Sequence, residues 1–493
     1  MRVVKLQQIQ LGEIDIADIQ FDSRSRDDIP AILIGLQYIF VNLNIREKVF
    51  SCLEKMLGSK IDTSTGRPGM MLWNIFVLGA IKLGANCDYD RLKELANNHL
   101  TLRQMLGHSG WDKPHDYALQ TLIDNVSLFT PDILMTINKI VVDAGHALLN
   151  INSSNALKAR CDSVVVKTDI HYPTDINLLW DAMRKLVETT GRACHKYSIP
   201  GWRQYRYNLK QLKKKFRKIQ NSRYSNSKDE EKRQEKIEAI HELYNDYLSM
   251  AQELIAKSEN ALIELAQKGD AIAILQIDGY ITHAERQIDQ TDRRVLKGET
   301  IPHGEKVFSI FEPHSEWISK GKAGVPVEFG VRVCVLEDQH QFILHHRVMW
   351  QETDDKIAVA LIEEAKILFP SLSQCSFDKG FYSPKNMTDL DKKLDLNIMP
   401  KKGGLNKAEK EKVKQAEYQQ ARRQHSAVES CINNLDQRGF DRCLSYGRDG
   451  FERHVGLSVV ATNIHRIGLI LQRQEREKQK KEKQRAQRYD RAA

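Results

Sequence analysis

Hydrophobic and polar residues follow one spacing in the first third of the chain and another spacing after it. Up to about residue 150, apolar residues recur every three or four positions, which is typical of helices with one buried face. Ile32–Val49 and Met70–Leu83 are the strongest such segments, and Asp88 and Thr130 stand where helix N-caps are expected. We therefore predict an all-α N-terminal region over residues 1–150.

Three short helices with tight turns are expected between about residues 66 and 108. This arrangement is compatible with a helix-turn-helix, whose second or third helix enters the major groove of DNA. A plain helical bundle that makes dimer contacts would have the same pattern. Both interpretations stay open, because the helix-turn-helix signal in a single sequence is weak.

The spacing changes at Asn155–Thr168, where three consecutive valines predict a buried strand. A hairpin is expected at Val325–Leu336 and Gln341–Trp350, and further strands at Ser373–Asp378 and Leu396–Pro400. With the helices between them these segments read β-β-β-α-β-α-β-α, a mixed five-stranded sheet. Right-handed crossovers place the first strand in its centre, with the Ser373–Asp378 strand parallel beside it.

A long insertion separates the first strand from the hairpin. Apolar spacing predicts a helical hairpin with arms at about Tyr205–Ile219 and Glu230–Ala266, and the segment 270–322 reads as irregular and β-rich. The last stretch is basic and has no apolar face, so we expect it to fray or to form a solvated extension. The predicted boundaries are the helical region 1–150, the sheet domain 155–177 and 323–472, the insertion 178–322 and the tail 473–493.

Composition narrows the class of protein. At 493 residues the chain is expected to hold two to four domains. Hydrophobic residues make up 41% and charged residues 28%, and we find neither an apolar run of about 18 residues nor a signal-peptide pattern. We therefore expect a cytosolic protein without a membrane partner. The eight cysteines have no Cys-x-x-Cys pair, which favours reduced buried thiols over structural zinc.

The net charge of +9, from 74 basic and 65 acidic residues, permits a polyanion partner. The most basic stretch, Lys196–Arg223, contains no acid and has Trp202, Tyr205, Tyr207 and Phe216 between its cations. Such a stretch can neutralise phosphates while its rings pack on sugars or bases. The alternative is the solvated face of a long helix.

Three carboxylates stand where a sheet usually holds ligands. Asp162 lies in the first strand, Asp378 at the exit of the parallel strand beside it, and Glu429 on a helix that can pack across the same edge. Each acid alone is more often structural, as a strand-start, turn or helix-surface residue. Their order and their placement on these elements suggest that they converge.

Three converging carboxylates would repel one another unless a cation lies between them. Mg²⁺ or Mn²⁺ is expected, because hard cations prefer oxygen ligands. Two ions about 4 Å apart could activate a water or a 3′ hydroxyl and stabilise the leaving oxygen of a phosphoryl displacement. In this hypothesis Asp162 bridges both ions, Asp378 holds one and Glu429 holds the other.

Several blocks of the chain together resemble the DDE transposases of bacterial insertion sequences. The likeness extends over about residues 60–470 and is nearest to the group filed as "not classified yet". The residues that carry it are Gly66-Arg-Pro-Gly-Met70, the stretch Leu92–Gly107, the first acidic block Asp162–Asp175, the second block Phe377-Asp-Lys-Gly-Phe-Tyr-Ser383 and the third block His425-Ser-Ala-Val-Glu-Ser430.

This resemblance implies an RNase H-like catalytic domain, dependence on Mg²⁺, and binding to terminal inverted repeats. It also implies cleavage and strand transfer within a dimer or larger synaptic assembly, in a bacterial, nucleoid-associated protein. Carried over by position, the triad is Asp162, Asp378 and Glu429, each also a metal ligand. Asp169 and Asp175 lie in the first block too, and Asp169 is the second candidate for its acid.

The third block departs from the resemblance at two positions. Many relatives carry an Arg four residues before the glutamate and a Lys or Arg seven residues after it. Here these positions hold His425 and Asp436, with Arg438 nearby. His425 could orient Glu429, a water or the scissile phosphate, but surface charge pairing would explain it and Lys379 equally well.

The expected partners are duplex DNA, as terminal repeats and target, and further copies of the chain; no small-molecule substrate is expected. We consider two rival functions, a transposase-derived DNA-binding protein without catalysis and a stand-alone metal-dependent nuclease. The insertion is expected to grip the element's ends or the flanking DNA. The residues predicted to contact DNA are Arg67, Arg91, Arg103, Arg203, Arg206, Lys213, Lys214, Lys215, Lys320, Lys322, Lys379 and His425.

Overall fold

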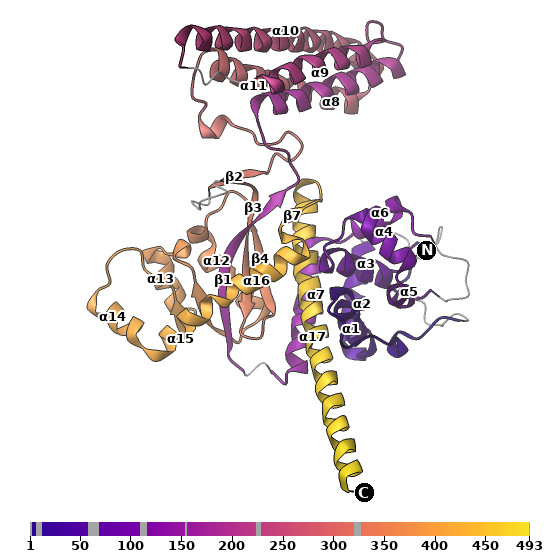
Figure 1. Ribbon diagram of the computed structural model, residues 1–493, viewed down its shortest axis with the longest axis vertical. Helices are drawn as coiled ribbons and strands as arrows, with labels where there is room; N and C mark the ends of the chain where they lie inside the picture. Colours follow the sequence, from indigo (N-terminus) through magenta and orange to yellow (C-terminus); the bar gives the residue numbers. More distant parts are fainter. Residues whose placement is uncertain are drawn as a thin grey trace. The chain divides into compact units, whose positions relative to one another are not determined.

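The computed structural model describes residues 2–5, 12–57, 69–108, 116–152, 155–222, 228–319 and 327–492 (Figure 1). The chain forms two compact units. The main unit comprises Met1–Asp169 and Glu316–Ala493, and the insertion unit comprises Ile170–Ser315. The structure therefore gives one unit where the sequence predicted a separate N-terminal domain and a sheet domain.

The N-terminal part of the main unit is helical, as predicted. Asp88 and Thr130 cap their helices as expected, accepting hydrogen bonds from the backbone N–H groups of Arg91 and Ile133. The helical spacing of Ile32–Val49 is divided between two helices, because Asn42 ends one helix and caps the next. The helices are α1 (Asp28–Val41), α2 (Leu43–Glu54), α3 (Leu72–Gly84), α4 (Tyr89–Asn98), α5 (Leu100–Met105), α6 (Leu119–Val126) and α7 (Pro131–Leu148), with 3₁₀ turns η1 (Ile16–Asp18) and η2 (Lys55–Leu57).

A mixed sheet forms the other part of the main unit, in the order β2-β3-β1-β5-β6 with β4 also on β3 and β7 on β1. The predicted centre is confirmed, since β1 pairs antiparallel with β3 and parallel with β5. Five strands were predicted, and the described residues hold two more, the short β2 and β7. The strands are β1 (Leu157–Thr168), β2 (Glu316–Ser319), β3 (Val327–Asp338), β4 (Ile343–Met349), β5 (Leu372–Phe377), β6 (Leu396–Ile398) and β7 (Arg442–Cys443).

The two faces of β1 are buried by different groups of residues, because alternate side chains of a strand point to opposite faces. Leu157, Ala159 and Cys161 belong to the core that β1 shares with the N-terminal helices. Val164 and Val166 pack on the other face, beside residues of a helix that follows the sheet. The helices after the sheet strands are α12 (Asp354–Leu368), α13 (Pro384–Asp391), α14 (Lys407–Lys414), α15 (Ala416–His425), α16 (Ala427–Leu435) and α17 (Gly447–Ala492), with the short η5 (Lys379–Phe381) and η6 (Asp436–Phe440).

Helix α17 joins the two parts of the main unit. It packs against α1, α3 and α7, and its Ile464 and Ile467 lie in the same core as β1 and β5. Of the described residues, α17 is the one unbroken helix long and apolar enough to span a membrane, and 83% of its apolar stretch is buried within the protein. Core helices of globular proteins have the same property. The tail predicted to fray instead continues this helix to Ala492.

The insertion unit is a set of four helices, α8 (Asp175–Lys196), α9 (Tyr205–Asn221), α10 (Glu230–Lys268) and α11 (Ala271–Thr291), followed by η3 (Asp292–Leu296) and η4 (His303–Glu305). The helical hairpin predicted from the apolar spacing is confirmed by α9 and α10.

The prediction that residues 270–322 are irregular and β-rich is wrong for α11. Gly269, with φ of 72°, ends α10. Asp270 caps α11, because its side chain accepts a hydrogen bond from the backbone N–H of Ala273. The buried Ile277, Ile281 and Ala284 then follow helical spacing. Of the described residues in the segment, Glu316–Ser319 alone form a strand, β2, which belongs to the main unit.

Helices α1 and α17 pack with their backbones almost in contact. A Cβ added at Gly468 would lie 1.8 Å from the carbonyl oxygen of Ala31, and one at Gly35 would lie 2.3 Å from that of Ile464. Neither oxygen belongs to a flexible side chain that could move away. The separation of these two helices is therefore set by glycine.

We predict that Gly468→Ala lowers the free energy of unfolding by about 1–3 kcal/mol, because the added methyl forces the helices apart. Gly279→Ala is the matched control, since a Cβ at this helical glycine meets nothing within 4 Å. It should stabilise by about 0.5–1 kcal/mol through helix propensity. Urea unfolding of both variants measures this, and equal stability of the two would contradict the predicted packing.

Candidate functional site

Strand register puts two of the predicted acids side by side. The last paired residues of β1 and β5 are Cys161 and Phe377, and Asp162 and Asp378 are the next residue on each strand. Side chains alternate along a strand, so both acids lie on the face opposite Cys161 and Phe377. This is the face that α16 covers, and α16 contacts β1.

Asp162 is half-buried. Its pKa is raised to about 6, mainly by burial and to a lesser extent by the charges of Asp378, Asp354 and Glu429, in that order. A hydrogen bond of 2.7 Å from the Ser163 backbone N–H to Oδ1 acts in the opposite direction. Asp378 and Glu429 therefore lie close enough to Asp162 for their charges to raise its pKa.

Asp354 is a fourth carboxylate, and sequence reasoning missed it. It is the first residue of α12, and its Oδ1 is buried without a hydrogen-bond partner among the described residues. Its Oδ2 lies 2.8 Å from the position of a Cβ built on Gly380, two residues after Asp378. An Asp in the first turn of a helix is normally explained by its favourable interaction with the helix dipole, so nothing in the sequence was a reason to consider Asp354 functional.

The other two acids are exposed. Asp378 precedes η5, and its side chain makes no capping hydrogen bond to that turn. Glu429 lies in the first turn of α16, and its backbone N–H donates to the carbonyl of Ser426. The alternative role of Asp378 as a turn-capping residue therefore has no hydrogen bond to support it.

Three polar contacts fix the junction of α15 and α16 against the sheet. Arg422 Nη1 donates to the carbonyl oxygen of Phe377 at 3.1 Å, and a 3.0 Å hydrogen bond joins His425 Nδ1 and Ser376 Oγ. Arg160 Nη1 reaches the carbonyl oxygen of Gln424 at 3.4 Å. Because α16 starts directly after this junction, these contacts determine where Glu429 stands.

His425 was predicted to contact DNA, but it lies in the interior of the protein. It is 8% exposed and packs on β5. Its pKa is lowered to about 4, mainly by burial and to a lesser extent by the charge of the nearby Arg422. The ring is therefore neutral at pH 7 and is held in the interior, which corrects the prediction of a phosphate contact and leaves a positioning role.

The donor chemistry of the four acids suits a hard cation, and the buried Asp354 Oδ1 offers a free oxygen. However, the part of the chain that the structure describes contains no group of three or more His, Cys, Asp or Glu side chains arranged to hold a metal ion. Asp378, Asp354 and Glu429 disfavour the charged form of Asp162, and a bound cation would relieve this repulsion.

The other acids of the first block have basic partners. Asp169, the second candidate, forms an ion pair with Arg442 of β7. Within the insertion unit, Asp175 pairs with Arg294 and lies in the first turn of α8. Asp169 and Asp175 therefore each have a basic partner, and Asp162 is the better-placed candidate of this block.

The basic stretch of the insertion unit forms an amphipathic helix. Trp202 and Phe216 are buried, Tyr205 is half-buried and Tyr207 is exposed. The prediction that these rings reach nucleotides is therefore wrong for Trp202 and Phe216, because they pack in the helical core. Arg203, Arg206, Lys213 and Lys214 are exposed, whereas Lys215 pairs with Asp246.

The other residues predicted to contact DNA, and Arg438 near the third acidic block, differ in exposure and in hydrogen bonding. Arg103 donates to the carbonyl oxygen of Asn97, and Lys379 is exposed beside Asp378. Arg438 is 1% exposed and donates to Asn434 and Asp28, so it lies in the interior, where it cannot meet a phosphate. Arg67, Lys320 and Lys322 lie outside the described residues.

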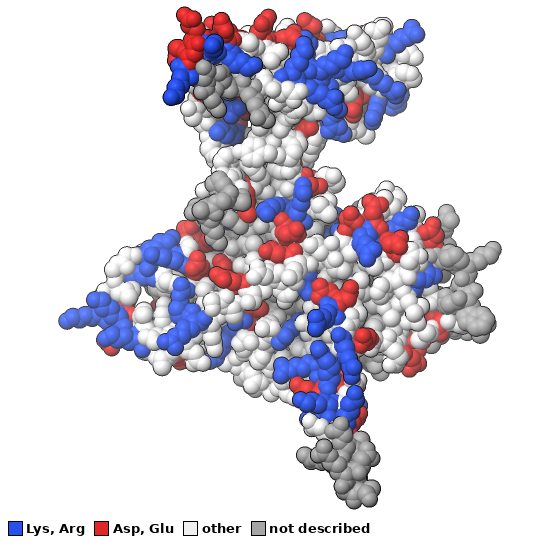
Figure 2. Space-filling view, viewed as in Figure 1, with Lys and Arg blue, Asp and Glu red and all other residues white. Residues whose placement is uncertain are grey.

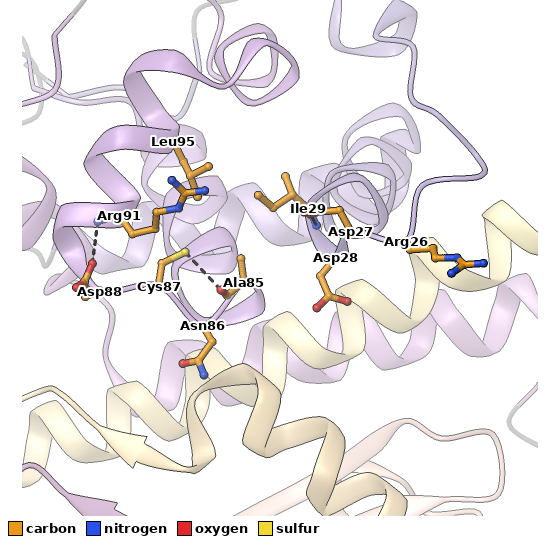
Figure 3. Close-up of a pocket in the computed structure, with 10 residues that line it drawn as sticks. All are labelled: Arg26, Asp27, Asp28, Ile29, Ala85, Asn86, Cys87, Asp88, Arg91 and Leu95. Atoms are coloured by element: carbon orange, nitrogen blue, oxygen red, sulfur yellow. Dashed lines mark hydrogen bonds between the residues drawn. The ribbon is translucent and has the colours of Figure 1, made fainter.

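Arg91 is exposed and lines an open hollow of about 610 Å³ in the helical part of the main unit (Figure 3). The acids around this hollow have structural roles. Asp27 and Asp88 cap α1 and α4, and Asp28 pairs with Arg438. The hollow therefore offers no carboxylate without a partner, and we do not assign it the chemistry.

Neither a family model, nor a curated protein, nor a solved structure matches this chain.

The raised pKa of Asp162 implies that its charge destabilises the protein without metal. The pKa of Asp162 is about 6 in the folded protein and near 4 in the unfolded chain, so its ionisation lowers the free energy of unfolding. This loss is complete above about pH 6 and absent below about pH 4. We predict that Asp162→Asn increases the free energy of unfolding at pH 8 in EDTA, on the order of 2 kcal/mol. The gain should disappear as the pH falls from 6 to 4.

Asp355→Asn is the matched control, since Asp355 is exposed beside Asp354 and should change stability by less than about 0.5 kcal/mol. Urea denaturation between pH 4 and pH 8 measures both variants. A gain for Asp162→Asn that does not depend on pH would rule out the electrostatic cause.

Proposed function

We propose that the chain is a DNA transposase of the DDE class, which cuts and joins DNA with divalent metal ions at the four-carboxylate cluster. The observation that carries this proposal is that Asp162 and Asp378 directly follow the last paired residues of β1 and β5, where Asp378, Asp354 and Glu429 raise the pKa of Asp162. A perturbed acid with specific charged neighbours is typical of functional centres. The three predicted acids also follow the order strand, strand, helix that the resemblance implies.

The sheet supports the same proposal. Leaving aside the short β2 and β7, its order is β4-β3-β1-β5-β6, with β3 antiparallel to both neighbours and β5 and β6 parallel to β1. This strand order agrees with the RNase H-like domain that the resemblance implies, and it therefore supports the proposal. The insertion unit enters between β1 and β3, leaving the order of these five strands unchanged.

In the proposed mechanism Asp162 and Asp378 would hold the divalent ions, and Glu429 and Asp354 would supply further oxygen donors from α16 and α12. Bound there, Mg²⁺ or Mn²⁺ supplies Lewis-acid chemistry and lowers the pKa of an attacking water or 3′ hydroxyl. Asp162 must be deprotonated to act as a donor, which its pKa of about 6 permits at neutral pH.

Arg160, Arg422 and His425 act as positioning residues in this proposal. Through Gln424, Phe377 and Ser376 they tie the start of α16 to the ends of β1 and β5. Displacing α16 by an ångström would move Glu429 away from the reacting phosphate, which is costly in a site that works by orientation.

The proposed partners are duplex DNA, as terminal repeats and target, and further copies of the chain in a synaptic assembly. The exposed cations of α9 are the proposed grip of the insertion unit on DNA (Figure 2). A helix-turn-helix role for α3–α5 remains part of the proposal, as does a place on the bacterial nucleoid.

A second candidate is a transposase-derived DNA-binding protein that no longer cuts. The specific observation in its favour is that no described group of side chains is arranged to hold a metal ion. Such a protein would bind the same DNA, and the two candidates differ only in metal-dependent cleavage.

The test uses a labelled duplex carrying the terminal repeat that flanks the chain's own gene, with Mg²⁺ or EDTA. We expect wild type to nick the repeat boundary with Mg²⁺ only, and Asp378→Asn to lose at least about 100-fold in rate while it still binds. Binding by wild type without cutting, with Mg²⁺ or Mn²⁺, would favour the DNA-binding protein. Nicking that persists in Asp378→Asn would remove this residue from the site.

A second prediction concerns Asp354. Asp354→Asn should raise the Mg²⁺ concentration for half-maximal cleavage by about 10-fold or more, because it removes an oxygen donor. It should also reduce the rise in melting temperature that Mg²⁺ gives wild type. The neighbouring Asp355→Asn is the matched control and should leave both unchanged; equal behaviour of the two variants would exclude Asp354.

A further inference from the structure

We propose that the segment Lys401–His425 binds the sugar-phosphate backbone of duplex DNA beside the carboxylate cluster. This inference rests on the proposed function, and it names the part of the surface that positions the DNA. None of the residues that carry it, apart from Lys379, was among the predicted DNA contacts. It follows from charge, pairing and contacts in the main unit.

The segment, called the basic excursion below, runs from the end of β6 through α14 and α15. It has a small core of its own, in which Tyr418 and Ala421 pack on Ile398 with Val413 beside them. It contains eight Lys and Arg residues and three Glu residues, which gives an excess of five positive charges. A core this small buries little apolar area, so the excursion adds little to stability.

Its cations fall into two groups. Lys401, Lys412 and Lys414 form ion pairs with Glu409, Asp391 and Glu411. The second group is exposed and has no ion pair among the described residues. Its members in the excursion are Lys402, Lys407, Lys410 and Arg423, and Lys379 and Lys385 join them from η5 and α13.

The excursion is anchored to the loop that carries Asp378. Lys402 Nζ donates to the carbonyl oxygen of Gly380 at 3.4 Å, and Arg422 donates to that of Phe377. Both acceptors lie within two residues of Asp378. The excursion is therefore held against the loop that carries Asp378, and two of the exposed cations, Lys379 and Lys402, lie at that loop.

Figure 2 shows Lys and Arg side chains gathered over the part of the main unit where Figure 1 labels α13, α14 and α15. Unpaired cations at short spacing repel one another, and a polyanion removes that repulsion while releasing its own counterions. Of the polyanions, duplex DNA presents phosphates at regular spacing over the length of two short helices.

The chemistry favours duplex backbone over single strands. Tyr418 is the only Phe, Trp or Tyr of the excursion, and it is buried, so no such ring is offered for bases to stack on. Lysines are flexible point charges that suit phosphates and read no base sequence. The surface therefore fits flanking or target DNA of any sequence rather than the terminal repeat itself.

The test is the salt dependence of binding. The full-length triple variant Lys402→Glu, Lys407→Glu, Lys410→Glu is titrated against a labelled random-sequence 30-base-pair duplex in EDTA, so that no cleavage is needed. We expect at least a 10-fold loss of affinity at 100 mM salt. The slope of log K against log salt should fall by about 3, since each lost phosphate contact removes about 0.9.

The matched control reverses three exposed lysines of α17, Lys478, Lys480 and Lys481, which changes the net charge equally. It should lose less than about 3-fold and keep the slope. Equal losses in both variants would show that net charge alone drives binding, and would overturn the proposal. An unchanged slope in the excursion variant would overturn it as well.

Two further measurements keep the result interpretable. Circular dichroism melting of the triple Lys→Gln variant separates lost DNA contacts from lost folding. This variant should melt as wild type does, and its slope of log K against log salt should still fall. Wild-type preference for phosphatidylserine vesicles or for single strands over the duplex would overturn the proposal. If wild type never cuts DNA but the excursion variant still loses salt dependence, the proposed catalysis fails and the proposal of DNA binding by the excursion stands.

Discussion

Strand β1 and its three pairings are the constraint on which the main unit depends. The strand pairs with β3 over nearly its full length, with β5 along its first half and with β7 at its end. One of its faces belongs to the core of the N-terminal helices, and the other is covered by α16. Every backbone group of such a strand must find its partner in one register, because a shift by one residue would exchange the two faces. The N-terminal helices, the sheet and α17 are one unit for this reason.

The same register has an electrostatic consequence. It puts Asp162 and Asp378 next to each other on one face, and the contacts of Arg160, Arg422 and His425 bring the first turn of α16 to that face. Packing alone would favour an apolar residue at Asp162, whose burial raises its pKa. A sequence that retains a carboxylate there gives up stability, and that supports a functional reason for the acid.

The sequence was sufficient for features that depend on local spacing, and insufficient for those that depend on tertiary contacts. Three consecutive valines identified β1, and the caps Asp88 and Thr130 identified helix starts, since each signal lies within a few residues. Asp354 was missed because its neighbours in space, Asp162 and Gly380, are far away in the chain. The helical spacing of the apolar residues of α9 includes Phe216, which is buried, but no local pattern showed that Trp202, ahead of the helix, is buried too.

Acids and bases lie next to each other at this end of the sheet without neutralising one another. Lys379 directly follows Asp378, yet among the described residues it forms no ion pair with any of the four carboxylates, and Lys402 binds a backbone carbonyl two residues away. Elsewhere the chain pairs its charges readily, as Lys401 does with Glu409. Keeping both signs unpaired costs electrostatic free energy on each side of the loop. The proposed binding of a cation and of a polyanion at adjacent positions would require this separation, so under that proposal the carboxylate cluster and the basic excursion form one surface.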